Sequence, residues 1–261
     1  MSSGLLSEYV LKKRLGETFR LQVYGEVDST NTLAREQAAA GAPEGTVILA
    51  DTQRQGRGRM GRQFFSPKGS GLYMSIILRP NAAATPLYVT TAAAVAVAEA
   101  IEEVAGVPSS IKWVNDVYCR GKKVCGILTE GAIADNLQYA VLGIGINVFP
   151  PIGGFPPEIE SRAGAVFGEK TPSAAHPREE LAAAIIARFW GYYEALSAKA
   201  FLPSYRKRDL LKGRTVEVLD INGTVIEEVT AQGITDDFEL LVSNRNGKIK
   251  ALSSGEVSLR L

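Results

Sequence analysis

The chain has 261 residues, which is long enough for one large domain with a small companion. Hydrophobic residues make up 46% and charged residues 22%, as in ordinary globular proteins, and the net charge of +1 gives no overall field that would draw the protein to nucleic acid or to an anionic membrane. Two cysteines, Cys119 and Cys125, are too few for a disulfide framework, and the apolar stretches are too short to span a bilayer. Because the first residues also lack the apolar core of a signal peptide, we expect a cytoplasmic protein that does not enter a membrane.

The chain contains one histidine, His176, in a stretch of turn-forming residues. A Ser-His-Asp or Cys-His mechanism would have this one candidate, and a His/Cys zinc site would need more ligands than the chain offers. We interpret His176 as a plain loop or helix-start residue. If the protein is an enzyme, its chemistry is expected to depend on Lys, Arg and carboxylate side chains.

Helix and strand signals alternate over the first 200 residues. Ser29, Thr30 and Asn31 are N-cap residues for an Ala-rich helix at 32–40, and apolar spacing predicts a helix at 86–105 and another that begins at Pro177. The expected strands are one around Tyr24 and those at 46–50, 72–78, 111–119, 124–129 and 138–148. Residues 149–177, rich in Pro and Gly, are expected to form an ordered loop or lid.

The pattern changes after residue 211. Short alternating strands are predicted at 214–220, 225–231, 238–243 and 257–261, with hairpin signals at Asn222-Gly223 and Asn246-Gly247. About five short strands with turns between them are typical of a small closed β-barrel. We therefore divide the chain into residues 1–211, expected to be α+β, and residues 212–261.

Residues 56–62, Gly-Arg-Gly-Arg-Met-Gly-Arg, follow the strand that ends near Asp51. The glycines allow the backbone to approach a ligand closely, and the arginines offer rigid guanidinium groups suited to carboxylate or phosphate. The segment is neither a P-loop nor a Rossmann fingerprint. It fits an anion clamp, while a solvated basic loop or a nucleic-acid contact stays open.

Three later segments also carry candidate side chains. In 112–116, Asp116 and Asn115 could hold magnesium, and Lys112 could pair with a phosphate or with Asp116. Such residues are also frequent where a strand enters a turn. In 122–128, a lysine that enters a strand could equally be a hairpin charge. In 143–147, the glycines would let a ligand, or a packed helix, lie against a strand.

Taken together and in this order, these segments resemble the biotin protein ligase family. The resemblance covers about residues 20–261, and the Gly-Arg heptad is its most specific part. The matching segments are 28–31, Gln53, 56–62, 112–116, 123–128, 143–147 and Gly255-Glu256-Val257-Ser258. Two positions depart from the family pattern, because Val114 stands where Pro is usual and Phe64 where Trp is often found.

The resemblance implies a mixed sheet packed with helices, like the class II synthetases, followed by a small C-terminal β-barrel domain. It implies that ATP activates biotin to biotinyl-5'-AMP, with Mg²⁺ held by Asp116, before the biotinyl group passes to a lysine of an acceptor. Lys123, Arg57 and Arg59 are the catalytic residues that it implies. The implied biotin-binding residues are Ser29, Thr30, Asn31, Gln53, Arg57, Gly58, Arg59, Lys123 and Gly126. The implied ATP-binding residues are Arg59, Phe64, Lys112, Asn115, Asp116 and Asn147.

The family also suggests the partners. The acceptor is expected to be a biotin carboxyl carrier protein, and a homodimer is allowed for. About 20 residues precede the strand around Tyr24, which are too few for a three-helix DNA-binding domain. We therefore expect the short form of the family, without DNA binding. The alternatives are a lipoate ligase or octanoyl transferase of the same fold, and a nucleic-acid-binding module that uses the loop arginines.

Overall fold

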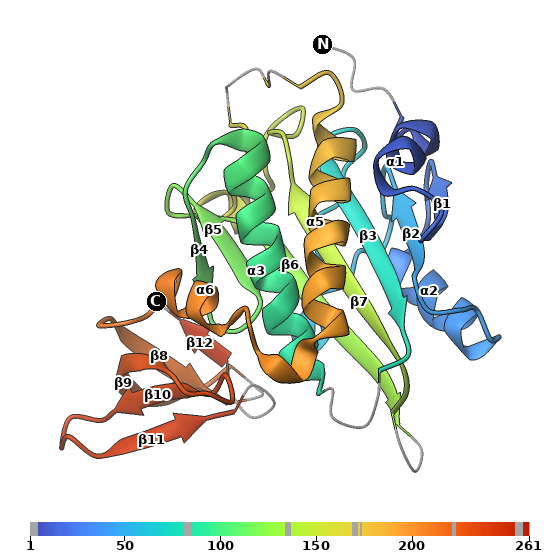
Figure 1. Ribbon diagram of the computed structural model, residues 1–261. Helices are drawn as coiled ribbons and strands as arrows, with labels where there is room; N and C mark the ends of the chain where they lie inside the picture. Colours follow the sequence, from blue (N-terminus) through green and yellow to red (C-terminus); the bar gives the residue numbers. More distant parts are fainter. Residues whose placement is uncertain are drawn as a thin grey trace.

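Seven strands form one mixed sheet in the order β1-β2-β3-β7-β6-β5-β4 (Figure 1). The computed structural model describes residues 5–80, 85–133, 137–168, 172, 174–220, 223–253 and 258–260. The strands are β1 (Arg20–Tyr24), β2 (Thr46–Ala50), β3 (Gly71–Leu78), β4 (Ser109–Lys112), β5 (Asp116–Cys119), β6 (Lys122–Ile133) and β7 (Leu137–Asn147). β1 pairs parallel with β2, and every other neighbouring pair is antiparallel. The α+β class with a mixed sheet is therefore confirmed.

Two long helices, α3 (Pro86–Ala105) and α5 (Pro177–Glu194), lie side by side across one face of this sheet (Figure 1). α3 begins where the side chain of Thr85 accepts a hydrogen bond from the backbone of Tyr88, and it ends at Gly106, whose φ of 62° suits glycine. Its alanines allow close packing, so most of the helix is buried. These two helices and the sheet enclose the main hydrophobic core.

The opposite face of the sheet is covered only in part, by α2 (Thr30–Ala39). A small core cluster fills the contact and consists of Ala34, Ala38, Ile48, Ile77 and Val141. Beyond the first turn of α2, the same face carries Gly126, Gly143 and Gly145, because side chains alternate between the faces along β6 and β7. This glycine-rich part of the face is where the candidate site lies.

Five strands near the C-terminus form a second, antiparallel sheet in the order β11-β10-β9-β8-β12. They are β8 (Thr215–Leu219), β9 (Val225–Ile234), β10 (Leu240–Ser243), β11 (Ile249–Leu252) and β12 (Ser258–Arg260). Four of these strands, β8, β9, β10 and β12, overlap the predicted ranges, and β11 brings the number to the five that were expected. The closure of this sheet into a barrel stays a prediction. Residues 255–257 of the Gly-Glu-Val-Ser segment lie outside the described residues.

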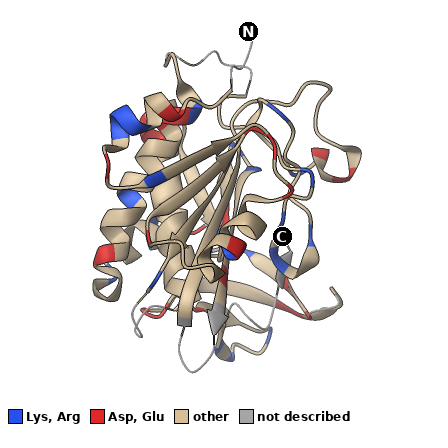
Figure 2. Ribbon diagram, turned by 90° about the vertical axis from the view of Figure 1, so that its right-hand side faces the viewer, with Lys and Arg blue, Asp and Glu red and all other residues tan. Residues whose placement is uncertain are grey.

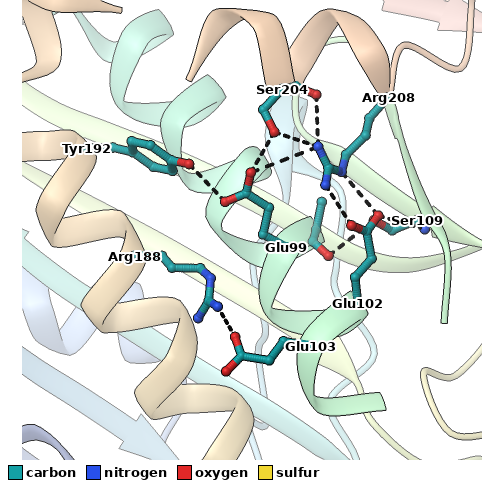
Figure 3. Close-up of polar contacts among 9 residues, drawn as sticks. Glu99, Glu102, Glu103, Ser109, Arg188, Tyr192, Ser204 and Arg208 are labelled. Carbon is teal, nitrogen blue, oxygen red and sulfur yellow. Dashed lines mark hydrogen bonds and ion pairs between the residues drawn. The ribbon is translucent and has the colours of Figure 1, made fainter. Parts of the chain in front are cut away.

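A polar network joins the C-terminal end of the first part of the chain to α3 (Figure 3). Arg208 follows α6 (Leu202–Lys207) and donates two hydrogen bonds to the carboxylate of Glu102 on α3, from Nε at 3.1 Å and from Nη2 at 2.6 Å. Glu102 in turn accepts a 2.8 Å bond from Ser109 at the start of β4. The residue pair Ile111 and Asp209 forms an isolated parallel bridge, so the segment after α6 extends the sheet beyond β4.

The structure corrects several predicted elements. The strand expected at 111–119 is two strands, β4 and β5, joined by a turn at Trp113–Asn115, with Lys112 paired opposite Asp116. Three elements were not predicted from the sequence: α1 (Glu8–Leu15), α6 and β11. The loop at 149–177 contains a short helix, α4 (Pro157–Glu160). Short 3-10 turns lie at Arg59–Gly61 (η1) and Leu196–Ala198 (η2). His176 directly precedes α5 as an exposed helix-start residue, as predicted.

Acidic and basic residues are both scattered over the ribbon (Figure 2). Within the described ranges, no helix has the length and apolar character needed to cross a membrane. The two cysteines are buried thiols in neighbouring strands, and burial raises the pKa of Cys119 to about 11.

Candidate active site

The first turn of α2 and the loop after β2 form a wall of neutral polar groups. The Ser29 side chain caps α2, and the backbone N–H and Oγ1 of Thr30 donate to Oε1 of Gln53 at 2.9 and 3.1 Å. Nε2 of Gln53 donates to Oγ of Ser66 at 2.9 Å. Oγ of Ser75 on β3 lies 2.8 Å from Oγ1 of Thr30 and 2.6 Å from Oδ1 of Asn31, so the side chains of Thr30, Asn31, Gln53, Ser66 and Ser75 belong to one hydrogen-bonded group. Three of the predicted biotin-binding residues are thereby brought together.

Glycines form the floor beside this wall. The space that a Cβ would occupy at Gly143 is taken by the Asn31 side chain, with Oδ1 at 2.0 Å. The corresponding space at Gly145 is taken by the ring of Phe64, whose nearest atom is at 2.7 Å, and the same ring lies 3.3 Å from a Cβ built on Gly126. The glycines therefore admit protein side chains to the sheet face. Phe64 covers the two central strands here, between the neutral wall and the charged residues described below.

The Gly-Arg loop is a narrow hairpin that stands over the same face. The backbone N–H of Phe64 donates to the carbonyl of Gly56 at 2.9 Å, and that of Gly58 donates to Arg62 at 2.7 Å. Gly56 can only be a glycine here, because a Cβ would lie 2.4 Å from the Phe64 carbonyl oxygen. The tip of the loop is η1, in which Met60 has a φ of 55° and is partly exposed.

Charged residues gather where β5 begins. Nζ of Lys123 lies 2.6 Å from Oδ1 of Asp116, and Lys123 also lies against Gly126, 3.4 Å from a Cβ built there. Nη1 of Arg59 donates to Oδ1 of Asn115 at 3.2 Å, and Nδ2 of Asn115 donates to the carbonyl of Ile127 at 2.7 Å. The predicted group of Lys123, Asp116, Asn115 and Arg59 is thus assembled in space.

Lys112 joins this cluster from the end of β4. Burial lowers the pKa of Lys112, Asp116 raises it, and the neighbouring Lys123 lowers it further. Burial also lowers the pKa of the Arg59 guanidinium, which the Asp116 charge partly offsets. Asp116 is therefore one carboxylate among several cations, and the cluster carries an excess of positive charge that suits an anionic ligand.

The two catalytic arginines that the sequence suggested are not in one place. Arg57 points away from the cation cluster, and its Nη2 pairs with Oε1 of Glu130 at 3.1 Å. Arg59 lies with Asn115. A shared phosphate clamp formed by both side chains is therefore absent from this conformation of the described residues.

The segment after α4 runs beside the cation cluster. The backbone N–H of Lys123 donates to the Arg162 carbonyl at 2.8 Å, and that of Gly164 donates to Lys123 at 2.9 Å. Nδ2 of Asn147, predicted near the nucleotide, donates to the carbonyl of Gly164 at 3.0 Å. Asn147 therefore fixes this segment against the end of β7.

The turn between β4 and β5 is held by residues far away in sequence. Nε1 of Trp113 donates at 2.8 Å to the carbonyl of Phe238, in the turn between β9 and β10 of the C-terminal sheet. The Tyr205 hydroxyl of α6 donates to the carbonyl of Val114 at 3.2 Å. Trp113 and Val114 are both buried, so the turn that carries Asn115 is packed against the C-terminal part of the chain.

Three residues at the site escaped the sequence analysis. Ser75 and Glu130 bond to the polar wall, and Leu128 lies between Gly126 and Glu130 on the same face of β6. The signal for Leu128 and Glu130 was the two-residue period of β6. Since Gly126 was already a candidate, Leu128 and Glu130 should have been candidates too.

The comparisons with known proteins agree with this geometry. Residues 24–147 match the biotin/lipoate A/B protein ligase family, and residues 212–260 match the biotin protein ligase C-terminal domain. The chain is 38% identical over 249 residues to the bifunctional ligase/repressor BirA of Bacillus subtilis, covering 91% of this chain and 73% of that protein. It is 29% identical to the biotin–[acetyl-CoA-carboxylase] ligase of Mycobacterium tuberculosis, covering 91% and 88% of the two chains.

A solved structure gives the same result. The biotin protein ligase from Aquifex aeolicus in complex with biotin and ATP aligns with a TM-score of 0.77 and 31% identity, over 92% of this chain and 98% of that one. The C-terminal match is to a domain described for biotin protein ligases. Together with the relatives, it establishes that this chain belongs to the biotin protein ligase family.

Proposed function

We propose that this protein activates biotin with ATP and transfers the biotinyl group to a lysine of a biotin carboxyl carrier protein. The observation that carries the proposal is the polarity of the site. Thr30, Asn31 and Gln53 offer neutral donors and acceptors at one end, while Lys123 and Arg59 supply positive charge at the other. Biotin has the matching asymmetry, with a neutral ureido ring at one end and a carboxylate at the other.

The neutral wall would bind the ring system of biotin. Its ureido group offers two N–H donors and one carbonyl acceptor, which amide and hydroxyl side chains can pair without charge. The partly exposed Leu128 adds an apolar surface for the thioether ring. Biotin bound in this orientation would direct its carboxylate toward Lys123.

The cation cluster would perform the first step. The biotin carboxylate oxygen forms a bond to the α-phosphorus of ATP, and the bond from that phosphorus to pyrophosphate breaks. Both reactants are anions, so a preorganised positive charge is required between them. Lys123 would release Asp116 and span the carboxylate and the α-phosphate, while Lys112 and Arg59 would hold the phosphates.

The second step needs an amine and a dry site. The acceptor lysine attacks the acyl carbon of biotinyl-5'-AMP, the bond to the AMP oxygen breaks, and the amine loses a proton. The mixed anhydride must meanwhile be kept from water, and closure of the Gly-Arg loop through Arg59 would exclude it. Phe64 would cover the floor beside the intermediate.

Asp116 is the protein anchor that we propose for magnesium. Carboxylate and amide oxygens suit this ion, and Asp116 and Asn115 supply them. Their Oδ1 atoms pair with Lys123 and Arg59, and the described residues contain no group of three or more His, Cys, Asp or Glu that could hold a metal. The ion would therefore take most of its ligands from ATP and water, and it would neutralise charge on the departing pyrophosphate.

We assign residues 1–211 to catalysis and residues 212–261 to a C-terminal domain. A cytoplasmic location and a homodimer remain part of the proposal. The location can be tested by cell fractionation, and the oligomeric state can be measured by light scattering.

Single-turnover formation of biotinyl-5'-AMP tests the proposal. Radiolabelled biotin and ATP should give the adenylate, and Lys123→Ala should lower the rate on the order of a hundredfold or more, because it removes the charge between two anions. Lys13→Ala, which removes an exposed lysine on α1, serves as the control and should match wild type. A wild-type protein that adenylates lipoate but not biotin would overturn the function. A Lys123→Ala rate within about threefold of wild type would overturn the role of the lysine.

A further inference from the structure

Glu130 of β6 lies at the neutral end of the site, where no substrate group of positive charge is expected. Its side chain is 22% exposed and shares a sheet face with Gly126 and Leu128. Its Oε2 accepts from Nδ2 of Asn31 at 3.0 Å, and its Oε1 lies 3.1 Å from Nη2 of Arg57. Arg35 of α2 is a second cation beside this carboxylate, with Nη1 at 3.6 Å from Oε1.

The carboxylate determines which way the Asn31 amide points. A carboxylate accepts hydrogen bonds and donates none, so it selects the NH₂ group of Asn31. Oδ1 of Asn31 is thereby directed to Ser75, whose Oγ lies 2.6 Å away. A residue with no acceptor at this position would leave the amide free to rotate by 180°.

The orientation of Asn31 affects the rest of the polar wall through Ser75. The Ser75 hydroxyl has one proton and lies within hydrogen-bond distance of both Asn31 and Thr30. Thr30 uses its own proton on Gln53, which donates onward to Ser66. The pattern of donors and acceptors that a ligand meets therefore depends on the amide that Glu130 holds.

Glu130 also holds the stem of the Gly-Arg loop. Arg57 forms an isolated antiparallel bridge with Gln63, which closes the base of the hairpin. Its guanidinium is 39% exposed and pairs with Glu130 on the neighbouring sheet face. An ion pair as exposed as this one contributes little to folding, so its main effect is to fix where the loop starts.

We propose that Glu130 is a positioning residue that sets the biotin-binding wall and the base of the Gly-Arg loop at the same time. The inference rests on the proposed function, because it assigns the neutral wall to biotin. Glu130 itself need not touch the substrate. It acts through Asn31 on one side and through Arg57 on the other.

Two substitutions separate these actions. Glu130→Ala removes both contacts and should raise the KM for biotin about tenfold or more, the scale of a lost charge-assisted hydrogen bond, while the KM for ATP stays within about twofold. Glu130→Gln keeps an acceptor for Asn31 but loses the charge that pairs with Arg57. It should leave the KM for biotin nearer to wild type and increase the release of biotinyl-5'-AMP.

The experiment measures both KM values, biotin affinity by calorimetry without ATP, and adenylate release for wild type and both variants. Glu227→Gln is the matched control, since Glu227 pairs with Lys250 at 2.5 Å in the C-terminal sheet and is 29% exposed. The control should match wild type. A Glu130→Ala protein with unchanged biotin affinity, or with equal increases in both KM values, would overturn the inference. If wild type forms no biotinyl-5'-AMP, the proposed function fails instead.

Discussion

The buried ion pair between Arg178 and Asp51 should contribute strongly to stability. Arg178 lies in the first turn of α5, and Asp51 directly follows β2. Their Nη1 and Oδ1 atoms are 2.7 Å apart, and the side chains are 5% and 2% exposed. Oδ1 of Asp51 also accepts from the backbone N–H of Leu6 at 3.3 Å. The Arg178→Met variant keeps much of the side-chain volume but leaves the Asp51 carboxylate without its cation.

Removing one partner of a buried pair costs about 3–5 kcal/mol, because the remaining charge stays desolvated. For a chain of this size, each kcal/mol corresponds to about 2–4 °C in Tm, so we expect a decrease of about 6–20 °C. Arg14→Met is the control, since Arg14 pairs with Glu180 while 45% exposed. Such a surface pair is worth about 0–1 kcal/mol. Tm is measured by circular dichroism, and urea unfolding gives the free energy.

The pair also connects stability to the site, because Thr52 and Gln53 follow Asp51 directly. We therefore expect the Arg178→Met variant to bind biotin more weakly at temperatures where it is still folded. The double variant Asp51→Leu/Arg178→Met, which leaves no buried charge, should regain much of the lost stability. The reasoning is refuted if Arg178→Met unfolds no earlier than Arg14→Met.

Three further predictions concern the loop, a buried carboxyl and DNA. Arg59→Ala should release biotinyl-5'-AMP, because it removes the hydrogen bond to Asn115 that holds the loop across the site. The released intermediate should biotinylate bystander proteins. Bystander labelling at background level, with normal adenylation, would contradict this. Burial raises the pKa of Asp209 above its ordinary 3.8, and its Oδ2 has no hydrogen-bond partner among the described residues. The free energy of unfolding should thus fall as pH rises through the window from 3.8 to the raised pKa. In urea unfolding, Asp209→Asn should be more stable than wild type by up to about 1 kcal/mol at pH 7 and equally stable near about pH 3. An equal gain at both pH values would exclude burial of the Asp209 charge as the cause. The protein should not bind duplex DNA below micromolar concentration at physiological salt with biotin and ATP present, since its charge is balanced; tight, sequence-dependent binding in a labelled-duplex titration would reopen a regulatory role.

Local sequence signals were sufficient for the elements whose start and stop residues are clear in the sequence. The helix α3 lies at the predicted residues because apolar spacing, Pro86 and Gly106 all agree. Ser29 caps α2 as expected, although the helix begins at Thr30, two residues earlier than predicted. Asp116 and Lys123 were both candidate residues, and the structure joins them by a 2.6 Å ion pair that was not predicted.

The missed features depend on contacts that are remote in sequence. Apolar residues run through the turn at Trp113–Asn115, so 111–119 resembled one strand. The turn forms because Phe238 and Tyr205 bury its residues, and neither could be placed beside it beforehand. Helix α1 was not predicted because half of its residues are charged and it buries one residue, Leu11.

The two ends of the site are supported by different parts of the chain. The neutral wall is held by α2, β3 and Glu130, all within the first 130 residues. The turn that carries Asn115 is held by Tyr205 and by Phe238 of the C-terminal sheet. Arg208 fixes α6 to Glu102 of α3, so the support at Val114 rests on a network that also reaches β4 (Figure 3). The C-terminal sheet is therefore a structural part of the proposed nucleotide end, and the proposed biotin end has its own, separate support.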